Sequence, residues 1–290
     1  MRRFTYHEPA TLDEAVSLLA APNAQILAGG TDLLVELKEQ LRRADSVVNI
    51  KKVSGLGGLR YDNGLHIGAL ATAREVETSP VVLDKYRSLA QSVRELGSIQ
   101  VRHRATIIGN VCRASPSADT IPPLIADGAS LRIRGAGGER TLKVEDFFLG
   151  PGRTVLKPGE VVTEIVVPPP PPGTRKIYIK HGRRKAMELA TVGVAVTHVP
   201  GAETRIVLGA VAPTPLRAKR AEAVLEGQTL SEALADRSGQ LASEEAKPIS
   251  DVRSSADYRR AMVGAMTKRA LLNAAVGPVT AWVERRDRRY

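Results

Sequence analysis

Five consecutive prolines, Pro168 to Pro172, place the strongest constraint on how this chain can fold. A run of prolines has no backbone donors and is held extended, so it can continue neither a helix nor the interior of a sheet. At 290 residues the chain has the length of about two domains. We therefore expect the prolines to connect two domains, residues 1–172 and 173–278, with a charged tail at residues 279–290.

The charge balance is strongly basic. Lys plus Arg number 42 against 31 Asp plus Glu, a formal charge of +11, which would suit nucleic acid as a partner. However, three Phe, six Tyr and one Trp offer few rings on which bases could stack, and the arginines are spread along the chain. We therefore expect no nucleic-acid partner, and a basic nucleic-acid-binding protein is the weakest alternative. The charge could equally serve a protein surface or an anionic cofactor.

The single cysteine, Cys112, excludes a disulfide framework, a zinc site of several cysteines and an iron–sulfur cluster held by this chain alone. The five histidines are scattered, and the usual catalytic and metal-binding motifs are missing, so no catalytic or metal-binding residue is predicted. Proline and glycines interrupt the longest uncharged stretch, residues 15–31, which argues against a membrane span. No apolar segment follows the basic N-terminus, so we expect a cytoplasmic protein.

Hydrophobic periodicity predicts a mixed α+β fold. Helices are expected at residues 12–19, behind a Thr11 cap, and between residues 73 and 96. The second domain should have three strands followed by helices around residues 219–225 and 258–275. The predicted strands are residues 25–28, 47–50, 65–70, 131–134, 139–142, 161–167, 176–181, 191–198 and 204–212.

The first of two glycine-bearing turns follows the strand at residues 25–28. Gly29 and Gly30 would let a phosphate approach the main chain, where consecutive N–H groups bind anions. Thr31 and Asp32 are placed to cap a helix over residues 33–40. A turn of this kind is also common as a purely structural feature.

The second turn, Thr-Ile-Ile-Gly-Asn, begins at Thr106 and offers hydroxyl and amide groups beside Gly109. Asp119 follows, and its carboxylate could bind hydroxyl groups of a ligand. The alternative role of Asp119 is to cap a helix that starts near Ile121. Together the two turns predict a clamp for a pyrophosphate with a polar neighbour.

Four segments, in this order along the chain, resemble the FAD-binding medium subunit of molybdenum hydroxylases. The family includes the flavin subunits of xanthine dehydrogenase, carbon monoxide dehydrogenase and 4-hydroxybenzoyl-CoA reductase. The resemblance extends from residue 1 to about residue 275. The segments are AGGTDLL at residues 28–34, TIIGNVCRASPSAD at 106–119, FFLGPGRT at 147–154 and KHGRRKAMELATVGVA at 180–195.

The resemblance implies a two-part FAD-binding domain of the vanillyl-alcohol-oxidase (PCMH) type, with subdomains at about residues 1–60 and 61–172, and a smaller α+β C-terminal domain. It also implies partners: an iron–sulfur small subunit with [2Fe–2S] clusters and a large subunit that binds the molybdopterin cofactor, assembled as a dimer of heterotrimers. This chain itself would bind one FAD non-covalently.

The resemblance also assigns roles to residues. Both glycine turns would hold the FAD pyrophosphate, Asp119 would contact the flavin nucleotide and Val162 would pack on it. Lys180 would lie near the isoalloxazine, where a cation stabilises negative charge on the reduced ring; on a strand, Lys180 could also simply be solvated. The predicted cofactor-binding residues are Ile26, Leu27, Ala28, Gly29, Gly30, Thr31, Asp32, Leu33, Leu96, Thr106, Ile107, Gly109, Asn110, Asp119, Val162, Lys180 and Leu189.

Two residues depart from the family pattern. Ile108 replaces the first glycine of the second turn, which would disfavour positive φ and add bulk beside the phosphate. Leu189 stands where carbon monoxide dehydrogenase members carry an aromatic residue, which disfavours carbon monoxide as the substrate. The resemblance as a whole implies an electron-transfer subunit that passes electrons from partner clusters to NAD⁺, a quinone or another acceptor. A stand-alone FAD oxidase of the same fold is the alternative.

Overall fold

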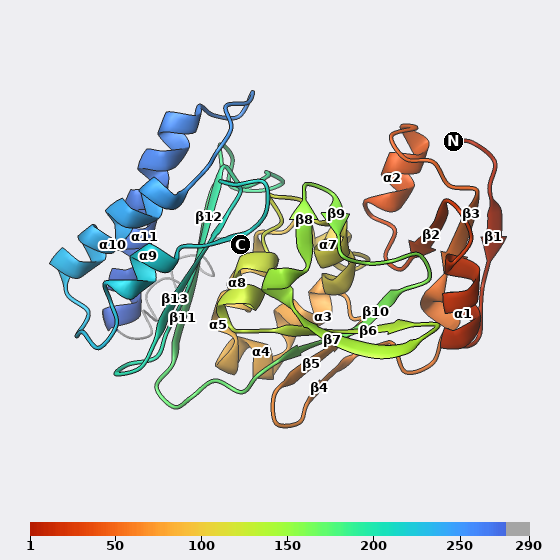
Figure 1. Ribbon diagram of the computed structural model, residues 1–290, viewed down its shortest axis with the longest axis horizontal. Coiled ribbons are helices and arrows are strands. Elements are labelled where there is room, and N and C mark those ends of the chain that lie inside the picture. Colours follow the sequence, from red (N-terminus) through yellow and green to blue (C-terminus); the bar gives the residue numbers. More distant parts are fainter. Residues whose placement is uncertain (277–290) are drawn as a thin grey trace.

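The computed structural model describes residues 1–276, so the predicted tail at residues 279–290 lies outside the described residues. Figure 1 shows three parts in a row, with the N-terminal part at one end and the C-terminal helices at the other. Each part is built on a sheet of its own. Helices and strands are mixed along the chain, which confirms the predicted α+β class.

The first part is a small parallel sheet with two helices. Its elements are β1 (Thr5–His7), α1 (Leu12–Leu19), β2 (Ala24–Leu27), α2 (Leu33–Lys38) and β3 (Ser46–Asn49). The strand order is β1-β3-β2, and Leu27, Leu37 and Val47 form a small core of their own. Thr11 caps α1 as predicted, because its hydroxyl accepts the backbone N–H of Glu14 at 3.2 Å.

The second part is a five-stranded antiparallel sheet with helices inserted between its strands. Its elements are β4 (Leu59–Tyr61), β5 (Leu65–Gly68), α3 (Ala73–Thr78), α4 (Pro80–Lys85), α5 (Arg87–Arg94), α6 (Ile99–Arg102), α7 (Ile107–Arg113), α8 (Ile121–Ala126), β6 (Ser130–Gly135), β7 (Gly138–Lys143), β8 (Phe148–Gly150), β9 (Arg153–Thr154) and β10 (Val161–Val167). The sheet order is β4-β5-β10-β6-β7. The helical region expected between residues 73 and 96 is three helices, because Pro80 opens a new one.

The third part is an antiparallel sheet covered on one face by helices (Figure 1). Its elements are β11 (Arg175–His181), β12 (Val192–His198), β13 (Thr204–Gly209), β14 (Leu216–Arg217), α9 (Lys219–Ala223), α10 (Glu232–Glu245) and α11 (Ala256–Val276). The three predicted strands are confirmed, whereas α10 was not predicted. Helices α5 and α8 of the second part pack against the other side of this sheet.

The proline run joins β10 to β11 as a largely exposed connection. Its first residue is held, since the hydroxyl of Tyr86 donates to the carbonyl of Pro168 at 3.0 Å. No helix in the described part of the chain is both long and apolar enough to cross a bilayer.

A buried ion pair fixes the start of β11 to the second part. The Nζ of Lys176 lies 2.8 Å from Oδ2 of Asp127, with both side chains almost fully buried. The hydroxyl of Thr197 donates to Oδ1 of Asp127 at 2.7 Å, and the Lys176 ammonium lies 4.4 Å from the ring centre of Tyr86. Burial lowers the pKa of Lys176, and the nearby Asp127 carboxylate opposes this effect. This pair therefore connects two parts that are built on separate sheets.

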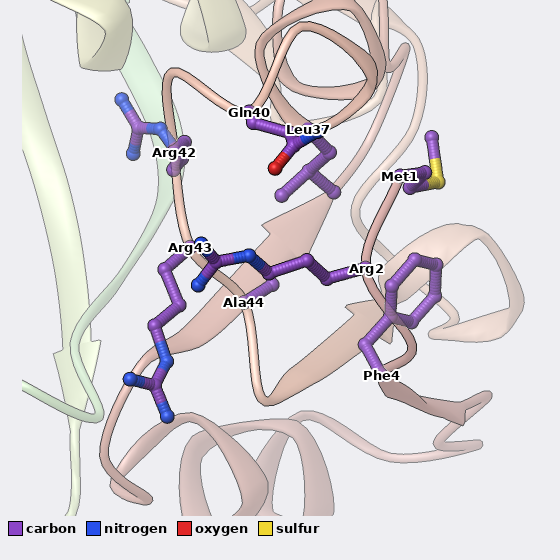
Figure 2. Close-up of a pocket in the computed structure, with 8 residues that line it drawn as sticks. All are labelled: Met1, Arg2, Phe4, Leu37, Gln40, Arg42, Arg43 and Ala44. Atoms are coloured by element: carbon purple, nitrogen blue, oxygen red, sulfur yellow. The ribbon is translucent and has the colours of Figure 1, made fainter.

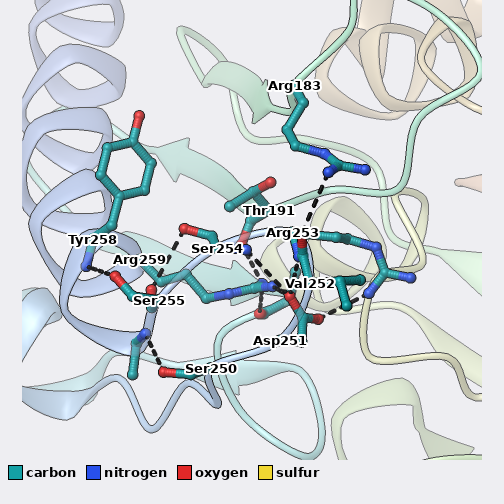
Figure 3. A network of polar contacts seen from close by, with 12 residues as sticks. Arg183, Thr191, Ser250, Asp251, Val252, Arg253, Ser254, Ser255, Tyr258 and Arg259 are labelled. Carbon is teal, nitrogen blue, oxygen red and sulfur yellow. Dashed lines mark hydrogen bonds and ion pairs between the residues drawn. The ribbon is translucent and has the colours of Figure 1, made fainter.

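A second polar network fixes the turn between α10 and α11 (Figure 3). The buried Arg259 guanidinium donates to the carbonyls of Thr191 and Ala210 and to Oδ1 of Asp251. Burial disfavours the charge on Asp251, but the backbone amide of Arg253 and the Arg259 guanidinium outweigh this and lower the pKa of Asp251 to about 2. The turn is thereby tied to the ends of β12 and β13.

Replacing Lys176 with Met should cost about 3–5 kcal/mol of unfolding free energy, because Asp127 would stay buried without its cation. Urea denaturation followed by circular dichroism measures this. The matched control is Arg43→Met, whose ion pair with Asp45 is exposed and screened by water, so its loss should change stability far less. Equal stability of the two variants would contradict the structural role given to the Lys176 pair.

Candidate cofactor site

The two glycine turns lie against each other, as the clamp hypothesis requires. A side chain at Gly29 would collide with the backbone carbonyl of Arg104, which stands two residues before the second turn. Only glycine permits this close approach of two backbones. Gly30 has φ of +78°, a conformation that also favours glycine. Both glycines of the first turn are thus required by its geometry.

The first turn presents free backbone donors. Within residues 1–276, no backbone carbonyl or side chain accepts a hydrogen bond from the amides of Gly30, Thr31 or Asp32. Consecutive amides of this kind form a concave anion site. The predicted cap by Thr31 or Asp32 is wrong: Asp32 occupies the cap position of α2, but its side chain makes no capping bond. Helix α2 also ends at Lys38, two residues earlier than expected.

The second turn is the start of helix α7. The Thr106 hydroxyl caps this helix by accepting the backbone N–H of Gly109 at 3.0 Å. A side chain at Gly109 would lie 2.7 Å from that hydroxyl oxygen. The Oδ1 of Asn110 accepts the hydroxyl hydrogen of Thr120 at 2.7 Å. Gly109 itself is exposed, so the helix start is open to a ligand.

Ile108 does not strain the second turn. The residue lies in the first turn of α7, where φ is not positive. Its side chain is buried in the main core with Ile107 and Val111. The expected backbone conflict is therefore wrong, because a helical position does not need glycine.

Two cations beside the first turn were missed by the sequence analysis. The Nζ of Lys51 donates to the carbonyl of Ala28 at 3.1 Å. Partial burial and repulsion from the Arg104 guanidinium lower the pKa of Lys51. An anion bound at the turn would relieve this repulsion. Arg104 comes close to the first turn only in the folded chain, where its backbone contacts Gly29.

Asp119 and Lys180 meet as a buried ion pair. The Nζ of Lys180 lies 2.8 Å from Oδ2 of Asp119 and donates to the carbonyl of Glu95 at 3.0 Å. The hydroxyl of Tyr178 donates to Oδ1 of Asp119 at 2.7 Å. The alternatives of Asp119 as a helix cap and of Lys180 as a solvated side chain are both wrong. Both groups are buried, and each satisfies the charge of the other.

Burial raises the pKa of Asp119 to about 6, against the opposing effects of the Lys180 ammonium and the Tyr178 hydroxyl. An unfolded aspartate titrates at about 3.9. The folded chain therefore holds this proton more tightly, and the contribution of Asp119 to the free energy of unfolding falls as the pH rises from about 4 to about 6. The carboxylate is ionised at neutral pH at a cost to stability.

Gly193 makes room for Tyr178. It lies opposite Lys180 in the pairing of β11 with β12, and a side chain at Gly193 would stand 2.9 Å from the Tyr178 hydroxyl oxygen. A glycine in the middle of a strand often marks such a close approach. Tyr178 was missed by the sequence analysis, although the alternation of Lys176, Tyr178 and Lys180 placed these polar groups on one face of the strand.

The remaining predicted residues are dispersed. Leu27 packs in the small core of the first part, while Ile26 is 37% exposed. Val162 is buried in the main core. Leu96 is buried just after α5, close to the carbonyl that Lys180 binds, and Leu189 is exposed before β12. Cys112 packs against the main core, and burial raises the pKa of its thiol to about 12.

Two cavities lie away from the predicted residues. Figure 2 shows the first, which holds about 70 Å³ between the N-terminal segment and the loop after α2, with Arg2, Arg42 and Arg43 around it. This volume is far too small for a dinucleotide. The second, of about 300 Å³, is lined by Arg60, His66 and residues around them on the five-stranded sheet. Neither cavity includes a residue of the two glycine turns.

The residues of the turns fit a dinucleotide cofactor. Three free amides, the start of α7 and two nearby cations suit a pyrophosphate. The buried pair of Lys180 and Asp119 offers one positive and one negative group to a polar ring system. These features lie on all three parts of the molecule, so only the folded chain brings them together.

Two family models together match almost the whole described chain. Residues 2–170 match the FAD binding domain in molybdopterin dehydrogenase, and residues 177–274 match the CO dehydrogenase flavoprotein C-terminal domain.

Individual relatives cover almost the whole chain. A carbon monoxide dehydrogenase medium chain from Hydrogenophaga pseudoflava is 35% identical over 94% of this chain and 97% of its own length. A xanthine dehydrogenase FAD-binding subunit from Escherichia coli O157:H7 is 30% identical over 93% of this chain and 95% of its own. The solved structure of the H. pseudoflava carbon monoxide dehydrogenase lacking the Mo-pyranopterin moiety matches with a TM-score of 0.90 at 36% identity, covering 94% of this chain and 97% of that chain.

Replacing Lys180 with Gln should raise the pKa of Asp119 above its value of about 6, because the cation that opposes burial is lost. Titration of the Asp119 carboxyl carbon by NMR measures this in the chain without ligand. Lys176→Gln is the matched control, since that lysine pairs with Asp127 and should leave Asp119 unchanged. An unchanged Asp119 titration in the Lys180 variant would contradict the ion pair.

Proposed function

We propose a function from one premise: the chain belongs to the family of flavin subunits that combine the FAD binding domain in molybdopterin dehydrogenase with the CO dehydrogenase flavoprotein C-terminal domain. This membership confirms the resemblance seen in the sequence. It also confirms that the chain is the FAD-binding flavoprotein subunit of an oxidoreductase. The electron path, the partners and the roles of single residues are the proposal.

The chain would serve as the electron-transfer subunit of a molybdenum hydroxylase. It would take electrons, one at a time, from the [2Fe–2S] clusters of a small subunit, while a large subunit oxidises the substrate at molybdenum. It would pass two electrons to NAD⁺, a quinone or another acceptor. The assembly would be a dimer of heterotrimers. FAD, when bound, supplies the conversion between one-electron and two-electron transfers.

The contact between Gly29 and Arg104 carries this proposal, because it brings both turns to one place. The amides of Gly30, Thr31 and Asp32 would bind one side of the pyrophosphate, and the start of α7 would bind the other. Lys51 and Arg104 would balance the negative charge of the phosphates.

The pair of Lys180 and Asp119 would serve the ring end of the cofactor. A buried ammonium stabilises negative charge far more strongly than a solvated one, since little water screens it. Asp119 and the carbonyl of Glu95 hold Lys180 in one position. The chain would supply a fixed positive potential, and no general base of its own is needed for electron transfer.

The chain co-expressed with its iron–sulfur and molybdopterin partners should purify as one complex with flavin absorbance and one FAD per chain. Metal analysis and the identity of the co-purifying subunits complete the measurement. A complex that is fully loaded with the other cofactors but lacks flavin would overturn the proposal. A chain that binds FAD alone and oxidises a small alcohol without partners would instead support a stand-alone oxidase.

Gly29→Ala should weaken FAD binding by about tenfold or more, because the methyl group would push the first turn away from Arg104 and split the pyrophosphate site. Fluorescence titration of the chain with FAD measures the affinity. The control is Gly137→Ala, where φ is not positive and an added methyl group meets open space. Equal affinities of the two variants would show that the contact of the two turns is not needed for binding.

A further inference from the structure

The C-terminal end of α5 is bound by two cations from other segments. Helices end with carbonyl groups that have no partner inside the helix, and these groups attract positive charge. Here the carbonyls of three successive residues, Arg94, Glu95 and Leu96, are the acceptors. Arg102 donates to the carbonyls of Arg94 and Leu96, at 3.3 and 3.0 Å. Lys180 donates to the carbonyl of Glu95 between them, at 3.0 Å.

Arg102 is almost completely buried, at 7% exposure, and its guanidinium forms several hydrogen bonds. Its Nε donates to Oε2 of Glu77 at 2.9 Å, and Arg74 donates to the same oxygen at 3.0 Å. The guanidinium therefore joins a carboxylate on α3 to two carbonyls at the end of α5. The planar fork of arginine suits this task, whereas a lysine presents a single point of charge.

We propose that Arg102 is a positioning residue that fixes Lys180 by holding the end of α5 in place. The inference rests on the proposed function for the role of Lys180, but it names a residue outside the predicted cofactor set. The carbonyl of Glu95 is one of the two acceptors of Lys180, and it stands between the two carbonyls that Arg102 binds. Without Arg102 this acceptor would lose the two flanking hydrogen bonds that help to hold it.

Loss of the Glu95 carbonyl as a fixed acceptor would free the Lys180 ammonium to move about Asp119. Its distance from a bound cofactor would then vary, and its stabilisation of the reduced form would weaken. Arg102 also stands four residues before Thr106, the cap of α7. One buried side chain thus connects the end of α5 with the approach to the second turn.

Arg259 offers a matched control within the same chain. It is also buried, at 3% exposure, and it also donates to two backbone carbonyls and one carboxylate. Figure 3 shows it beside Thr191 and Asp251. Its carbonyl partners belong to Thr191 and Ala210 rather than to the end of α5. A loss of stability alone should therefore appear in both variants, and an effect on Lys180 only in the Arg102 variant.

The test compares Arg102→Gln, Arg102→Lys and Arg259→Gln in the full chain loaded with FAD. The midpoint potential is measured by equilibrium reduction against a reference dye. Arg102→Gln should lower the potential by about 30 mV, a tenfold loss in preference for the reduced form of a two-electron couple. Arg102→Lys keeps the charge beside Glu77 and should fold with an intermediate shift, and Arg259→Gln should leave the potential unchanged.

A second measurement does not depend on FAD. NMR of the Lys180 ammonium in the chain without ligand reports how fast its protons exchange with water, and Arg102→Gln should accelerate this about tenfold. Unchanged exchange in both Arg102 variants would overturn the inference, as would potential shifts of equal size in the Arg102 and Arg259 variants. If the wild-type chain bound no FAD, the proposed function would fail, and the exchange rates alone would still decide the role of Arg102.

Discussion

Two buried lysines on one face of β11 determine how the C-terminal sheet sits on the rest of the molecule. Lys176 pairs with Asp127 and Lys180 with Asp119, and all four side chains are nearly excluded from solvent. A buried charge is tolerated only when its partner stands in a fixed place and the remaining polar atoms are bonded. The two pairs therefore allow very few positions of the sheet against α5 and α8. The placement of Lys180 against the end of α5 follows from this constraint.

Under the proposed function, the cofactor site is built mainly from backbone. Gly29 permits two main chains to touch, and the amides that follow it have no partner within the described chain. At the start of α7, by contrast, the amide of Gly109 already donates to the Thr106 hydroxyl. Backbone donors at such positions do not need to be reorganised when an anion binds, since the helix and the packed core already hold them. Side chains matter most at the other end of the site, where Lys180 must be held in one position.

The proposed function accounts for the single cysteine and for part of the excess positive charge. The Cys112 thiol is packed against the core with a raised pKa, so it is a poor candidate for redox chemistry. Iron–sulfur clusters need several thiolates, and one cysteine cannot provide them. Under the proposed function they belong to a partner. Part of the excess charge lies beside the turns, at Lys51 and Arg104, where an anionic dinucleotide would use it.

The sequence by itself determined most strands, the two glycine turns and the family, because these depend on local patterns: alternation, proline and glycine geometry, and contiguous motifs. It did not predict α10, and it gave Asp119 and Lys180 weaker alternatives as a cap and a solvated residue. Those alternatives failed because the partner of each residue lies 61 positions away. Arg102 and Lys51 carry no local signal of their role. Only the tertiary structure determines these roles, since burial and long-range pairing are properties of the folded chain.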